Sequence, residues 1–296
     1  MQIVIAGAGA MGLLVGSYFA QTGQSIAFYT RREEQAAQLR EKGLNRIVDG
    51  RSTVFQVDAF SRLSLAPCNA LWIIAVKSRD LTSIIEQLEA HAEPRHLLFI
   101  QNGLRHLEVG RETSVPSVAI GSLTHGALKE DDRTIIHKGF GVMNLAELKG
   151  SPELSNELLK LQSLQFPIHR HSDAFQMLME KAIINCCINP ITTILEMKNG
   201  EILENSYAHD VMRSVYEEIA MVYPQVAKAV SFSQVEEVCK KTAENQSSMF
   251  NDRRNKVPME IDTIIHAILE GHEEEMPVLY LMEKLLNAID GRVDRA

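Results

Sequence analysis

The chain has 296 residues, a formal net charge of −8 and a hydrophobic fraction of 45%. This length accommodates two ordinary domains, and the composition is that of a globular protein. Negative charge without a basic stripe argues against a nucleic-acid partner. No apolar run reaches membrane-spanning length, and the first residues have a strand pattern, not that of a signal peptide. We therefore expect a cytoplasmic protein with neither a nucleic-acid nor a membrane partner.

Cysteine usage indicates a reducing compartment and no metal site. The four cysteines, Cys68, Cys186, Cys187 and Cys239, show neither a paired framework nor the spacing of metal ligands. Cys186 and Cys187 are adjacent within an apolar run, which is typical of small buried hydrophobic side chains.

The first half of the chain alternates strand and helix patterns, which favours a parallel sheet with crossover helices. The expected strands are 2–6, 25–29, 70–76, 97–101 and 118–122, and the expected helices are 11–22, 32–42 and 81–89. Residues 134–137 and 141–145 are candidates for late antiparallel strands around Lys138 and Gly139.

Strand signals fade after Pro167, where long stretches carry apolar residues at helical spacing, at 175–188, 211–229 and 261–269. We therefore predict an α/β protein with two domains. Residues 1–167 form a Rossmann-type, doubly wound parallel sheet, and residues 168–296 form a mainly α-helical domain that binds the substrate.

A glycine-rich turn follows the first expected strand and opens the first expected helix. It has the pattern G-x-G-x-x-G and consists of Gly7, Ala8, Gly9, Ala10, Met11 and Gly12. In this context the three glycines permit a tight turn, close approach of the backbone to a pyrophosphate, and close packing of helix on strand. The amide groups at the start of the helix then face the anion. The alternative is an ordinary glycine-rich turn.

The end of the second strand favours NADPH over NADH. An NAD-binding unit has a carboxylate there that binds the ribose 2′-hydroxyl. This chain has Arg31 and Arg32 instead, and the first carboxylate is Glu33. A guanidinium binds a 2′-phosphate in a charge-assisted way. The alternative is that the two arginines only begin a solvated helix, and this alternative is stronger for Arg32.

A polar stripe crosses an otherwise apolar helical segment in the second half. Lys181, Asn185 and Asn189 are spaced i, i+4 and i+8, so each is offset by about 40° from the previous one along one helix face. Burying such groups without partners costs roughly 1–3 kcal/mol each. The stripe therefore indicates a ligand, or else contact with another polar helix or a wet surface.

Further polar residues stand where strands or helices are expected to end or begin. Asn102 and Lys77 follow expected strands, where ligands bind in open α/β sheets, although either residue also suits a turn. The segment from Asn245 to Met249 and the carboxylates Glu260 and Asp262 read, by themselves, as a helix cap and a solvated acidic turn.

Taken together, these motifs resemble the ketopantoate reductase (2-dehydropantoate 2-reductase) family over nearly the whole chain. The matching motifs are GAGAMG at 7–12, QNG at 101–103, TH at 124–125, K-x-x-x-N-x-x-x-N-P at 181–190, NG at 199–200, SSM at 247–249 and EID at 260–262. The resemblance implies NADPH-dependent reduction of 2-dehydropantoate to (R)-pantoate in pantothenate and coenzyme A biosynthesis, with Lys181 as proton donor.

The resemblance also implies roles for the other residues. The cofactor would be bound by the glycine turn, Arg31, Lys77, Asn102, Ala127 and Glu260. The substrate, a small 2-oxo acid, would be bound by Asn102, Lys181, Asn185, Asn189, Asn199, Asn245 and Ser248. The resemblance leaves a homodimer as an open expectation.

The chain departs from the family pattern after Asp262. Ile265 and His266 stand where the family usually has an Asn-Gly pair, and the stretch 270–277 is shortened. Two alternatives therefore stay open. One is a related two-domain dehydrogenase acting on another 2-oxo acid or a 3-hydroxy acid, and the other is a non-catalytic NADPH-binding regulator.

Overall fold

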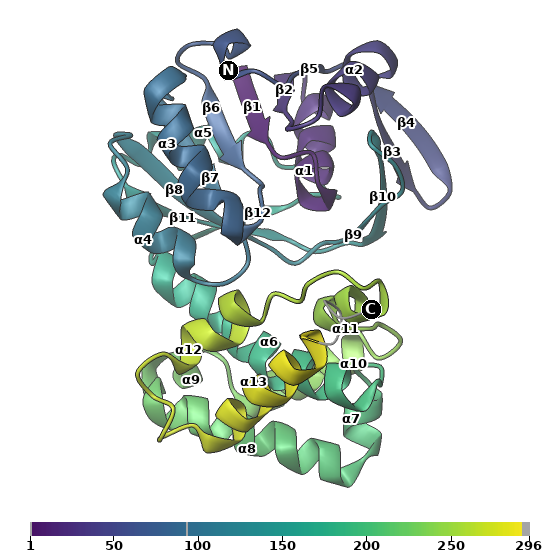
Figure 1. The fold of residues 1–296 in the computed structure, drawn as a ribbon, viewed down its shortest axis with the longest axis vertical. Helices are drawn as coiled ribbons and strands as arrows, with labels where there is room; N and C mark the ends of the chain where they lie inside the picture. The colour runs from purple at the N-terminus through teal and green to yellow at the C-terminus, as the bar shows by residue number, and fades with distance from the viewer. Residues whose placement is uncertain (1, 93, 292–296) are drawn as a thin grey trace. The chain divides into compact units, whose positions relative to one another are not determined.

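The computed structural model describes residues 2–92 and 94–291, which divide into two compact units. The first unit ends at Met177 and the second begins at Leu178. The first unit has two sheets flanked by helices, and the second is helical (Figure 1). The predicted class, an α/β N-terminal part followed by a mainly α-helical part, is confirmed.

The main sheet of the first unit has eight strands in the order β12-β11-β8-β7-β6-β1-β2-β5. All neighbouring pairs are parallel except β11 and β8, which are antiparallel. The strand order reverses at β1, whose neighbours are β2 and β6, and such a switch point is where open α/β sheets bind ligands. The strands are β1 (Gln2–Ala6), β2 (Ser25–Tyr29), β5 (Asp58–Phe60), β6 (Leu71–Ile74), β7 (His96–Phe99), β8 (Ser117–Leu123), β11 (Met143–Lys149) and β12 (Ile168–His171).

A second sheet of four strands has the order β4-β3-β10-β9 and packs against α1 (Figure 1). Its strands are β3 (Leu44–Val48), β4 (Arg51–Phe55), β9 (Gly126–Lys129) and β10 (Thr134–Gly139). The sequence patterns predicted only β10 of this sheet.

The helices of the first unit cover the main sheet and join its strands. In Figure 1, α3 and α4 lie side by side, and α5 packs on β11 and β12. The helices are α1 (Ala10–Gln21), α2 (Glu33–Lys42), α3 (Leu81–His91), α4 (Arg105–Glu112) and α5 (Glu153–Leu159), with short 3₁₀ turns at Leu63–Leu65 and Ser78–Asp80.

Two expectations about the end of the first unit need correction. The late strands do not pair with each other, because β10 joins β9 and β3 in the second sheet while β11 joins β8 and β12 in the main sheet. The unit also continues past Pro167, because β12 pairs with β11 as the edge strand of the main sheet. The division therefore falls inside α6, after Met177.

The second unit is formed by helices around α6, whose side chains are largely apolar. Its helices are α6 (Ala174–Leu195), α7 (Glu201–Glu204), α8 (Ser206–Val222), α9 (Pro224–Ala229), α10 (Phe232–Lys241), α11 (Ser248–Arg254), α12 (Ala267–Leu269) and α13 (Pro277–Asp290), with a π-helical turn at Asp262–His266.

One proline of this unit marks a helix boundary, and another lies inside a helix. The expected helix 211–229 is two helices, because Pro224 takes the first position of α9 and has no N–H with which to continue α8. Pro190, in contrast, lies inside α6, which continues to Leu195. The expected helix at 175–188 is therefore longer than its pattern predicts.

Candidate active site

The glycine turn has the geometry that a pyrophosphate requires. Gly7 has φ +106°, and a Cβ on Gly12 would lie 2.0 Å from the Gly7 carbonyl oxygen, so α1 packs on β1 only with glycine there. A Cβ on Gly9 would meet no atom of the described residues within 4 Å. Gly9 is the N-cap of α1 and has no side chain to cap it, so the start of the helix presents amide groups beside open space.

The two arginines after β2 have different surroundings. Arg32 donates to the Asp132 carboxylate, which also accepts from Lys129 at 3.3 Å. The Arg31 side chain is 77% exposed, and its Nη1 lies 3.6 Å from an Asp80 carboxylate oxygen. An exposed ion pair of this kind contributes little. Arg31 is therefore the more exposed of the two arginines, and its binding of a 2′-phosphate stays a prediction.

The carboxyl ends of β6, β7 and β8 bring further predicted residues to the same edge of the sheet as the glycine turn. Lys77 follows β6 and is exposed, Asn102 follows β7, and Ala127 lies in β9 shortly after β8. Gln101 was not assigned a role. Its buried side chain donates to the carbonyls of Ile74 at 2.9 Å and Val76 at 3.3 Å, which joins the ends of β7 and β6.

A buried chain of aromatic and imidazole groups from α1, β10 and the segment after β8 was missed by sequence reasoning. The Tyr18 hydroxyl lies 2.7 Å from His137 Nδ1, and His137 Nε2 lies 3.1 Å from His125 Nδ1. His125 stacks on Phe166 with ring centroids 4.6 Å apart. Burial, together with the smaller effect of the neighbouring His137, lowers the pKa of His125 to about 4. Of these residues, the sequence drew attention only to His125, through the Thr124–His125 pair.

The predicted polar stripe of the second unit lies along α6. Asn189 is buried, and Lys181 and Asn185 are half-buried among apolar neighbours such as Ile183 and Cys187. Burial lowers the pKa of Lys181 to about 8, and the negative charge of Glu260 opposes this shift. A lysine with that pKa is still mostly protonated at pH 7 and releases its proton more readily than an ordinary lysine.

Two amides of this unit have buried polar atoms without a partner. Among the described residues, neither Asn189 Nδ2 nor Asn199 Oδ1 has a hydrogen-bond partner. Asn199 is held in place from its other side, because its Nδ2 donates to Thr242 at 2.9 Å and its backbone N–H donates to Asn245 at 3.0 Å. A buried amide that leaves an atom unpaired is costly unless a ligand completes it.

The segment around Asn245 and Ser248 begins a helix, as one interpretation of the sequence had it. Ser247 is the N-cap of α11 and accepts from the Phe250 N–H at 3.2 Å. Ser247 also accepts a hydrogen bond from Thr192 of α6 at 2.8 Å. Asn245 and Ser248 are exposed on either side of this buried contact.

Glu260 stands just before the π-helical turn, where the chain departs from the family pattern. Ile265 is fully buried there, and His266 Nδ1 lies 2.9 Å from a carboxylate oxygen of Glu283 in α13. The two departing residues therefore pack this turn against α13 within the second unit.

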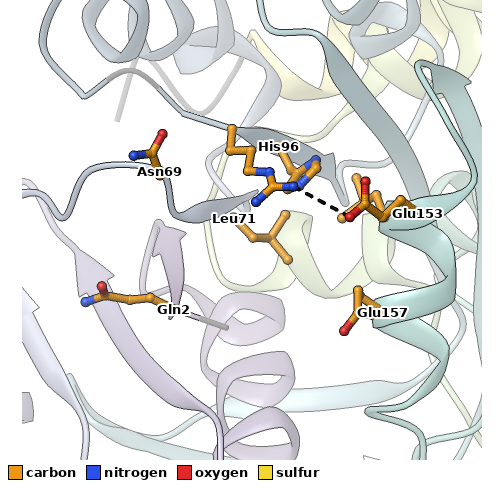
Figure 2. A pocket seen from close by; sticks show the side chains of 8 residues that line it. Gln2, Asn69, Leu71, His96, Glu153 and Glu157 are labelled. Atoms are coloured by element: carbon orange, nitrogen blue, oxygen red, sulfur yellow. Dashed lines mark ion pairs between the residues drawn. The ribbon is translucent and has the colours of Figure 1, made fainter.

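A pocket of about 280 Å³ lies elsewhere in the first unit (Figure 2). Gln2, Leu71 and His96 line it from the amino ends of β1, β6 and β7, and Glu153 and Glu157 of α5 face them across it. The glycine turn lies at the opposite, carboxyl edge of the same strands. The pocket is therefore not part of the candidate active site.

No group of three or more metal-binding side chains was found within residues 2–92 and 94–291. In the same residues, every helix is too short or too polar to cross a membrane.

A glycine turn at the switch point of a mostly parallel sheet, followed by a helical unit with a lysine–asparagine stripe, defines a two-domain oxidoreductase that uses a nicotinamide cofactor. The family model described as "Ketopantoate reductase PanE/ApbA" matches residues 3–150, and the one described as "Ketopantoate reductase PanE/ApbA C terminal" matches residues 173–289. The chain belongs to the ketopantoate reductase family.

Individual relatives agree with this assignment. The chain is 35% identical to a 2-dehydropantoate 2-reductase of Listeria monocytogenes, covering 99% of this chain and 98% of the relative. It is 31% identical to the Bacillus subtilis enzyme of the same name, covering 91% and 90%. A crystal structure of a probable 2-dehydropantoate 2-reductase from Bacillus subtilis has a TM-score of 0.87 at 28% identity, covering 98% of this chain and 100% of that one.

Proposed function

We propose that the protein reduces 2-dehydropantoate to (R)-pantoate with NADPH, and that Lys181 is the proton donor. The observation that carries the proposal is the α6 stripe, in which a lysine of lowered pKa is followed by a buried asparagine whose amide nitrogen has no partner among the described residues. The family and the names of the relatives support 2-dehydropantoate as the substrate, and a place in pantothenate biosynthesis is part of the proposal. A cytoplasmic location and a homodimer remain parts of the proposal.

The cofactor side of the reaction is assigned to the first unit. The glycine turn, from Gly7 to Gly12, offers amide groups and open space to a pyrophosphate, and Arg31 offers an exposed guanidinium to a 2′-phosphate. Lys77 and Asn102 follow β6 and β7 at the same sheet edge, Ala127 lies in β9 shortly after β8, and all three are proposed to line the nicotinamide. When bound, the cofactor supplies the hydride for the ketone carbon.

The substrate side is assigned to the second unit. As the ketone carbon is reduced, negative charge develops on its oxygen, and the Lys181 ammonium donates first a hydrogen bond and then a proton to that oxygen. Asn185 and Asn189 orient the hydroxyl and ketone groups. Asn199, Asn245 and Ser248 hold the carboxylate end, and Glu260 contacts the cofactor.

The test is NADPH oxidation by the purified protein with 2-dehydropantoate, compared with Lys181→Ala. General acid catalysis contributes about 10²- to 10⁴-fold, so the variant should lose turnover by that factor while its Kd for NADPH, measured by fluorescence titration, stays unchanged. Lys241→Ala removes an exposed lysine of α10 and is the matched control.

The outcomes separate the alternatives. Turnover of another 2-oxo acid, but not of 2-dehydropantoate, would replace the substrate and keep the mechanism. NADPH binding without turnover of any acid in a panel would support a regulator. Near-normal turnover in Lys181→Ala would remove Lys181 from the acid role.

A further inference from the structure

The segment that follows Glu260 is the π-helical turn at Asp262–His266, called the π-turn below. Such turns are rare and occur frequently at functional sites. The carbonyl of Glu260 accepts from the Ile264 N–H at 3.1 Å and from the Thr263 hydroxyl at 3.2 Å. These two hydrogen bonds fix the backbone of Glu260 relative to the π-turn. The position of the turn therefore determines where the Glu260 side chain starts.

The π-turn is in turn bonded to α6. The Cys186 thiol donates to the Ile264 carbonyl at 3.3 Å, and both residues are buried. Burial raises the pKa of Cys186 to about 12, so the thiol keeps its proton and remains a donor. Two contacts hold the other end of the segment, namely His266 with Glu283 at 2.9 Å and the Tyr223 hydroxyl with the Ile268 carbonyl at 3.1 Å.

The same helix carries Lys181, a little more than one turn before Cys186. Glu260 acts electrostatically on the Lys181 ammonium. The connections therefore form a closed loop: α6 carries the ammonium and the thiol, the thiol binds the π-turn, and the π-turn carries the carboxylate that acts on the ammonium.

We infer that Cys186 is a positioning residue, whose bond to the Ile264 carbonyl holds Glu260 in register with Lys181. The contacts that link Cys186, Glu260 and Lys181 lie within the second unit, and their effect on the pKa of Lys181 can be measured without turnover. Only the kinetic part of the test rests on the proposed function. Cys187, the next residue, is equally buried, but among the described residues its thiol makes no hydrogen bond like that of Cys186.

The titratable groups around this loop fix the sign of the expected effect. Glu260 is the charged group that raises the pKa of Lys181 against the effect of burial. Cys186 and Tyr223 are neutral at physiological pH, because burial raises the pKa of each. If Glu260 moves away, the pKa of Lys181 must therefore fall.

The experiment compares Cys186→Ala, Cys186→Ser and the matched control Cys187→Ala. The apparent pKa of the Lys181 amine is measured in the cofactor-free protein by competitive amine labelling against pH, with the 181 peptide quantified by mass spectrometry. Cys186→Ala should lower this pKa by about half a unit or more. Cys186→Ser retains a hydroxyl donor and should restore it, and Cys187→Ala should leave it unchanged.

The kinetic readout should move in the same direction. In Cys186→Ala, the alkaline limb of kcat for 2-dehydropantoate reduction should shift to lower pH, with kcat affected more than KM. No shift, an upward shift, or an equal shift in Cys187→Ala would overturn the positioning role. A labelling shift in a protein that fails to reduce 2-dehydropantoate would leave the role standing and remove the proposed function. Melting temperatures identify any variant that fails to fold. If Cys186→Ala is such a variant, the pKa of Lys181 in Cys186→Ser decides whether the positioning role holds.

Discussion

The hydroxyl of Thr192 in α6 donates to the hydroxyl of Ser247, the N-cap of α11, at a distance of 2.8 Å. One turn before Thr192 on the same helix stands Asn189, and Asn245 accepts the backbone N–H of Asn199. Hydrogen bonds therefore join segments that lie 43 to 55 positions apart in the chain, and they hold the two incompletely paired amides of the second unit in fixed positions.

Arg31→Ala should weaken NADPH binding much more than NADH binding. A charge-assisted hydrogen bond contributes about 1.5–3 kcal/mol, which corresponds to roughly a 10- to 100-fold change in Kd. The measurement is a fluorescence titration of each variant with both cofactors. Arg79→Ala, which removes another exposed partner of Asp80, is the control. Equal losses for the two cofactors would show that Arg31 does not bind the 2′-phosphate.

Alanine at two glycines of the turn should separate binding from folding. Gly9→Ala places its Cβ in open space, so the melting temperature should stay near that of the wild type while NADPH binding weakens by about tenfold or more. Gly12→Ala brings its Cβ to within 2.0 Å of the Gly7 carbonyl and should lower the melting temperature sharply. Normal NADPH affinity in a folded Gly9→Ala protein would contradict the assigned pyrophosphate site.

Sequence patterns predicted the elements that are determined by residues close together in the chain. The expected strands at 2–6 and 25–29 coincide with β1 and β2, and the polar stripe at Lys181, Asn185 and Asn189 falls on one helix. Periodicity and glycine spacing are properties of neighbouring residues, so the sequence displays them directly.

The sequence patterns did not predict most of the second sheet or the histidine cluster, because both are stabilised by contacts between residues that are far apart in the chain. In the second sheet, β4 is exposed along most of its length and shows no apolar alternation. Tyr18 and His137 are 119 positions apart, and no local pattern connects them. The Cys186–Ile264 bond likewise joins residues 78 positions apart.

Turnover should fall as the pH rises past about 8. The proposed acid must carry its proton, and Lys181 loses that proton around a pKa of about 8 instead of near its ordinary value of 10.5. The rate of 2-dehydropantoate reduction, measured at saturating NADPH from pH 6 to pH 10, should therefore decline tenfold for each unit well above that pKa. A rate that stays constant up to pH 10 would exclude a lysine with a lowered pKa as the donor.

The buried histidine cluster should make the first unit sensitive to acid. His125 Nδ1 accepts the Gly141 N–H at 3.1 Å, an arrangement that requires the neutral ring. The pKa of His125 is about 4 in the folded protein against an ordinary 6.5, so the unfolded chain binds more protons between those values. The stabilisation that depends on the neutral His125 ring is fully present above pH 6.5. It is lost as the pH falls towards 4, so the free energy of unfolding decreases by up to about 3 kcal/mol.

This loss is measured by urea unfolding at a series of pH values from 8 to 4.5. The tryptophan signal of the first unit reports unfolding and gives the free energy of unfolding at each pH. His125→Asn keeps an oxygen acceptor for the Gly141 N–H but has no titratable group. It should start from a lower free energy of unfolding at pH 8 and decline less steeply with acid than the wild type. His169→Asn, which changes an exposed histidine of β12, should follow the wild-type slope. Identical slopes in all three proteins would mean that protonation of His125 does not limit acid stability.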